Sequence, residues 1–85
     1  MQKLRYKPLM TNLLQIHPTA SVRVISFSGG KSLRAKLTQY GIHPGDHLHV
    51  LRVAPLGGPV LVECSGREIA LGRGVAEKII VEPDA

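Results

Sequence analysis

The sequence predicts a mainly β fold, a small and partly open barrel of about five short strands with one inserted α-helix. Three observations support this prediction. Apolar and polar residues alternate in short runs, clusters of glycine, proline, asparagine and serine separate these runs, and one segment near the middle has helical periodicity. A length of 85 residues fits a single domain, which we expect to cover 1–85.

Residues 1–19 form an N-terminal segment, in which we expect one short helical turn over 11–16, capped by Thr11 or Asn12. The first strand is expected over 21–28, because this run is rich in β-branched residues and ends at two glycines.

The clearest helix is expected over 33–40. Leu33, Leu37 and Tyr40 have the spacing i, i+4 and i+7, which places them on one apolar face. Ser32 is the expected N-cap, and Gly41 suits the left-handed position after the last turn.

The remaining residues predict a β-meander. Strands are expected over 47–54, 60–64, 67–71 and 78–82, joined by a glycine-rich loop at 55–59, a tight hairpin at 65–66 and one 3₁₀ turn within 72–76.

The run VISFSGGKSLRAKL at 24–37 has the strand, glycine, lysine, serine and helix order of a phosphate-binding P-loop. That motif needs a glycine five positions before the one that precedes its lysine, and Ile25 stands there. A β-branched residue resists the backbone geometry of the phosphate cradle. We therefore interpret Gly29-Gly30-Lys31-Ser32 as a turn that leads into a helix.

Composition limits the function classes. A net charge of +5 predicts attraction to an anionic partner, whether nucleic acid, the inner membrane surface or an acidic protein face. No run of about 20 apolar residues is present, so no membrane insertion is expected. The single Cys64 excludes an internal disulfide, which suits the cytoplasm. Cys64 shares one strand face with Val60 and Val62, which predicts a small buried residue rather than a nucleophile.

Three of the four histidines lie within GIHPGDHLH. His47 and His49 are two residues apart on a predicted strand, so their side chains share one face. Imidazole ligands at this spacing suit Zn²⁺, Fe²⁺ or another late divalent ion. The alternatives are adventitious metal binding, a metal-linked homodimer and ordinary surface histidines.

A series of short motifs follows in order along the chain: Leu33 to Leu37 followed by Gly41-Ile42, Pro44-Gly45, Ala54-Pro55 with the Gly57-Gly58-Pro59 loop, and Ile69-Ala70-Leu71 before Ala76. In this series, from Ser28 to Val81, the chain resembles FeoA-domain proteins, which are small SH3-like barrels of the bacterial ferrous iron transport system. One departure concerns the basic residue that usually follows the leucine of the fourth strand. Here Gly72 follows, and Arg73 comes one position later.

The resemblance implies an SH3-like fold and a non-enzymatic, cytoplasmic accessory of FeoB, a membrane iron transporter with a GTP-binding domain. No cofactor is required, and any nucleotide belongs to the partner. The expected contacts with the partner are Leu56, Gly57 and Gly58 in the loop, with Lys31 and Arg34 at the start of the helix.

The alternative is a metal-responsive or nucleic-acid-binding SH3-like module. Barrels of this kind bind RNA through basic residues and stacked aromatic rings. Tyr6, Phe27 and Tyr40 are the only aromatic residues, and the last two are expected in the core. We therefore expect no specific nucleic-acid binding.

Overall fold

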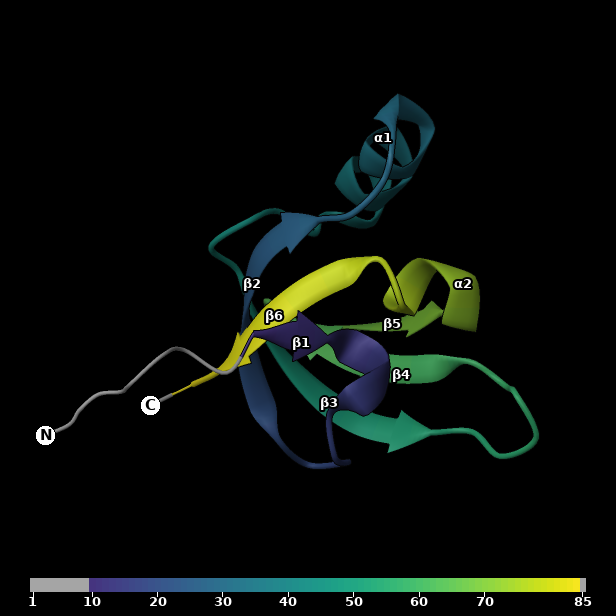
Figure 1. Cartoon of the computed structure of the whole chain (residues 1–85). Coiled ribbons are helices and arrows are strands. Elements are labelled where there is room, and N and C mark those ends of the chain that lie inside the picture. The colour runs from purple at the N-terminus through teal and green to yellow at the C-terminus, as the bar shows by residue number, and fades with distance from the viewer. Residues whose placement is uncertain (1–9, 85) are drawn as a thin grey trace, which may run out of the picture.

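The computed structural model describes residues 10–84. Its elements are β1 (Thr11–Asn12), a 3₁₀ helix η1 (Leu13–Gln15), β2 (Ser21–Phe27), α1 (Lys31–Tyr40), β3 (His47–Val53), β4 (Val60–Cys64), β5 (Arg67–Leu71), α2 (Arg73–Ala76) and β6 (Ile79–Pro83). Figure 1 shows the strands curving around a shared interior, with α1 projecting beyond the end of β2.

The strands form one antiparallel sheet in the order β1-β6-β2-β3-β4-β5. Its register shifts between Val24 and Ser26 on β2 and between Val50 and Arg52 on β3. Such bulges bend the strand that carries them and increase its twist. They give a short sheet the curvature of an SH3-like, partly open barrel, which is the predicted fold class.

The core lies on the concave face of the sheet and follows the predicted alternation. On β4, Val60, Val62 and Cys64 are buried, whereas Glu63 is exposed. Leu37 of α1 and Leu13 of η1 are also fully buried, so both helical segments contribute to the same core. Burying aliphatic side chains of this size contributes about 1.5–3 kcal/mol each to folding.

The expected strands agree closely with the observed ones. β4 and β5 match residue for residue, β2 and β3 each end one residue earlier, and β6 is shifted by one residue. The hairpin between β4 and β5 turns at Ser65 (φ 54°) and Gly66 (φ 80°). Two successive positive φ angles are typical of the type I′ turn that matches strand twist.

The expected start of α1 was wrong. The helix begins at Lys31 rather than Leu33, and its N-cap is Gly30, which makes no side-chain capping bond. Ser32 is therefore already inside the first turn and cannot cap it. Leu33 approaches the turn before the helix closely, because a Cβ on Gly29 would lie 2.5 Å from Cδ2 of Leu33. Gly29 thus lets Leu33 pack closely against the turn.

The end of α1 is as predicted. Gly41 has a left-handed backbone (φ 79°), and the N–H of Ile42 donates to the carbonyl of Leu37 at 2.9 Å. This bond places Ile42 back against the helix, and both side chains are fully buried. The hydrogen bond and the apolar contact together are the features of a Schellman-type ending.

Two smaller expectations need correction. The helical turn expected over 11–16 is shorter, because Thr11 and Asn12 pair with Val81 and Ile80 as the additional strand β1. Asn12 does cap η1, since its Oδ1 accepts a hydrogen bond from the N–H of Leu14 at 2.9 Å. The segment at 72–76 forms an α-helical turn, α2, rather than a 3₁₀ turn.

Candidate functional site

The loop between β3 and β4 presents the most exposed large apolar side chain of residues 10–84. Leu56 has a relative exposure of 103%. The loop is held tightly beneath it, because the N–H of Gly58 donates to the carbonyl of Pro55 at 3.1 Å and that of Ala54 donates to Pro59 at 3.0 Å. The side chain of Leu56 therefore stands at the tip of a closed loop.

Leu56 also has a strained backbone, with φ at 59°. A left-handed conformation costs a residue with a Cβ about 1–2 kcal/mol. Exposure of a leucine to water adds a second unfavourable feature, since burial of that side chain elsewhere would be favourable. Two local costs at one exposed residue mark it as a candidate for a role outside folding.

The glycines of this loop shape it. A Cβ on Gly58 would lie 2.7 Å from the Cβ of Ala54, so a larger residue there would open the loop. Gly57 has φ at 77°, and a Cβ built on it would lie 3.8 Å from Cδ of Arg73. Gly57 and Gly58 thus allow the tight loop that holds Leu56 at its tip.

Arg73 is a neighbour of the loop that was not among the predicted contact residues. It is the first residue of α2 and lies beside the loop. The available signal was its position, one residue after the place where the family resemblance leads us to expect a basic side chain. The local surface therefore combines an apolar tip with an adjacent cation.

Lys31 and Arg34 occupy the first turn of α1 and are exposed. Figure 1 places α1 far from the loop between β3 and β4. The five predicted contact residues therefore do not form one patch. They divide into a loop surface (Leu56, Gly57 and Gly58) and a helix surface that includes Lys31 and Arg34.

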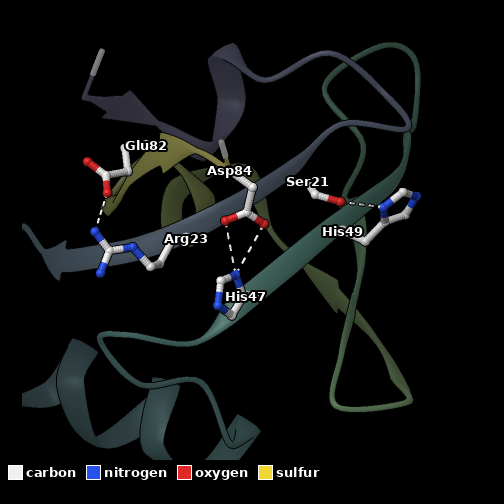
Figure 2. Close-up of polar contacts among 6 residues, drawn as sticks. All are labelled: Ser21, Arg23, His47, His49, Glu82 and Asp84. Atoms are coloured by element: carbon white, nitrogen blue, oxygen red, sulfur yellow. Dashed lines mark hydrogen bonds and ion pairs between the residues drawn. The ribbon is translucent and has the colours of Figure 1, made fainter. Parts of the chain in front are cut away.

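His47 and His49 lie on one face of β3, as predicted, but they have different partners. Nδ1 of His47 lies 3.0 and 3.1 Å from the two carboxylate oxygens of Asp84, and Nδ1 of His49 lies 2.9 Å from Oγ of Ser21. Figure 2 shows the two rings lying apart, each turned to its own partner.

These contacts belong to a row of polar pairs across β6, β2 and β3. An ion pair between Arg23 and Glu82 links β2 to β6 on the same face (Figure 2). Between residues 10 and 84, no three histidine, cysteine, aspartate or glutamate side chains are grouped so that they could hold a metal ion. The observed role of the row is to connect the three strands.

Cys64 is buried, with its Sγ 4.0 Å from Oγ of Ser65. The predicted burial is confirmed. Across the described part of the chain, no helix is both long enough and apolar enough to cross a lipid bilayer.

Comparison with known proteins gives a consistent result. The FeoA domain model matches residues 11–83. The protein of Methanocaldococcus jannaschii named "Putative Fe(2+) transport protein A" is 39% identical over 61 residues, which cover 72% of each chain.

Solved structures extend the likeness to three dimensions. A crystal structure of an iron uptake regulatory protein, FeoA, has a TM-score of 0.81 and 30% identity, and the match covers 87% of this chain and 97% of that one. A manganese-dependent transcriptional repressor has a TM-score of 0.84 at 20% identity, over 93% of this chain and 44% of the repressor, and shares the fold alone. The chain belongs to the FeoA domain family.

Proposed function

We propose that this protein is a non-enzymatic, cytoplasmic accessory of ferrous iron transport, which docks on the cytoplasmic domain of a FeoB-type transporter and modulates it. Family membership supports the link to iron transport, since similar proteins are named for Fe(2+) transport and iron uptake regulation. The observation that carries the docking is Leu56, a fully exposed leucine on a closed and strained loop.

The loop has the properties of an interface anchor. Binding energy in protein interfaces is concentrated in a few side chains that enter pockets on the partner. A side chain that is already held in place loses little conformational freedom on binding. The hydrogen bonds at 3.0 and 3.1 Å across the base of the loop provide this preorganisation for Leu56. Arg73 beside Gly57 favours a pocket with an acidic rim.

A binding titration with the cytoplasmic domain of the transporter, in the presence and absence of GTP, tests this proposal. The wild-type chain is expected to bind, and Leu56→Asn to bind at least about tenfold more weakly, which corresponds to ~1.4 kcal/mol. Asparagine tolerates the left-handed conformation, so the free energy of unfolding should stay within about 0.5 kcal/mol of the wild-type value.

Met10→Ala is the matched control. Met10 is the other large apolar side chain exposed within residues 10–84, at 57%, but it lies before β1 and outside the loop surface. Its truncation is expected to change the affinity by less than about twofold, as for most residues outside a hot spot. Equal affinities for Leu56→Asn and the wild type would exclude the loop as the anchor, and no binding of the wild type in either nucleotide state would reject docking itself.

A further inference from the structure

The charges of this chain are divided unequally along its length. Residues 1–45 contain seven lysine and arginine residues and no aspartate or glutamate, whereas residues 46–85 contain four basic and six acidic residues. The overall charge of +5 therefore understates the positive charge of the first half. Asymmetry of this kind is typical of chains that contact a polyanionic surface.

The fold concentrates part of this charge on α1. Lys31, Arg34 and Lys36 are all exposed, and the helix contains no acidic residue. None of the three forms an ion pair with another residue of 10–84, although Arg23, His43 and His47 all have acidic partners there. The N-terminal end of the helix dipole adds a partial positive charge. α1 therefore presents cations that the described residues do not neutralise.

The three cations are spread over the side of α1 that lies opposite its apolar stripe, which we call the outward arc. Leu37 is buried, and Leu33 and Tyr40 pack partly against the core. At about 100° per residue, the remaining side chains form the arc opposite this stripe. Its residues other than the cations are small or polar, namely Ser32, Ala35, Thr38 and Gln39. All the residues of this arc are exposed, and Figure 1 shows α1 projecting from the sheet.

We propose that α1 is a contact surface for an anionic phospholipid bilayer. Lysine and arginine side chains on flexible stems suit mobile headgroups, which require no fixed geometry. The outward arc has no large apolar residue, so it lacks the anchor that a protein interface is built around. It also lacks an aromatic platform for nucleic-acid bases, because Tyr40 packs against the core and Phe27 is buried.

This inference rests in part on the proposed function, which places the protein beside a membrane transporter. The loop surface and α1 are far apart in Figure 1, so one can contact the transporter while the other faces the bilayer. The contact is electrostatic and peripheral. It should weaken steeply as salt screens the charges.

Sedimentation with lipid vesicles tests the inference without any transporter, so its outcome is independent of the docking experiment. The chain is expected to bind vesicles of phosphatidylcholine mixed with phosphatidylglycerol and not vesicles of phosphatidylcholine alone. Each cation near an anionic surface is worth about fivefold in partitioning. The triple variant Lys31→Gln, Arg34→Gln and Lys36→Gln should therefore bind about 100-fold more weakly.

The matched control removes the same charge elsewhere, with Arg52→Gln, Arg73→Gln and Lys78→Gln, all exposed and outside α1. It should retain most of the binding. Equal losses in the two variants would show that net charge alone is responsible and would overturn the inference. So would unchanged binding of the α1 variant, absence of wild-type binding, or release of the chain from vesicles by an equal phosphate concentration of duplex DNA. Thermal unfolding of both variants confirms that they are folded.

Discussion

At the scale of single residues, the starts of η1 and α1 are capped differently. Oδ1 of Asn12 accepts a bond from the N–H of Leu14, whereas Gly30 at the start of α1 offers no side chain. Ser32 has the residue type of a cap but lies inside the first turn of α1. The sequence could not distinguish these cases, because the position of a cap depends on where the backbone becomes helical. At α1 the backbone becomes helical at Lys31, one residue before Ser32.

This difference predicts unequal effects of two similar substitutions. Asn12→Ala should lower the free energy of unfolding by about 1 kcal/mol, because a capping bond is lost. Ser32→Ala should change it by less than about 0.5 kcal/mol, as expected for an exposed position without a capping role. Urea denaturation of both variants measures the two values. A larger loss for Ser32→Ala than for Asn12→Ala would contradict the observed start of α1.

At the scale of elements, α1 is attached to the sheet through its last turn. Nη2 of Arg67, on β5, donates to the carbonyl of Tyr40 at 3.0 Å. A Cβ on Gly41 would lie 2.4 Å from the same Nη2. Gly41 therefore has two roles, since it adopts the left-handed ending of the helix and leaves space for the arginine that connects α1 to β5.

Substitution of two glycines separates these roles. Gly41→Ala and Gly45→Ala both place a side chain at positive φ, 79° and 95° respectively, and each should cost about 1–2 kcal/mol of stability. Space around Gly45 is open, so Gly41→Ala should be the more destabilising of the two. In an Arg67→Ala background the two alanine substitutions should cost similar amounts by thermal unfolding. A persistent difference would show that the arginine contact is not its cause.

The strands were more predictable than the helical segments. The alternation in VLVEC and the Ser65-Gly66 turn are local signals, and both gave the correct bounds of β4. β1 could not be predicted, because two residues carry no periodicity and form a strand only by pairing with β6. The bulges at Val24/Ser26 and Val50/Arg52 were also missed, since they depend on the register of the partner strand.

At the scale of the whole molecule, the curved sheet separates two surfaces that the sequence had grouped together. The Pro55–Pro59 loop could be predicted from its composition, and so could the exposure of its tip. The strained backbone of Leu56 and the approach of Arg73 to Gly57 could not, because both depend on tertiary packing. The distance between this loop and α1 also depends on how the elements are arranged in the fold. The residue types of the candidate contacts do not indicate whether those residues lie close together.

If the chain affects iron transport by docking through Leu56, as we propose, then a substitution at Leu56 should change ferrous iron uptake by cells. The uptake rate is measured in cells that carry the transporter together with the wild-type chain, Leu56→Asn, Met10→Ala or no chain. The three chains are present at equal levels of folded protein. Leu56→Asn is expected to reproduce the uptake rate of cells without the chain, whereas Met10→Ala is expected to reproduce that of the wild type. Uptake with Leu56→Asn equal to that with the wild type would contradict docking through Leu56.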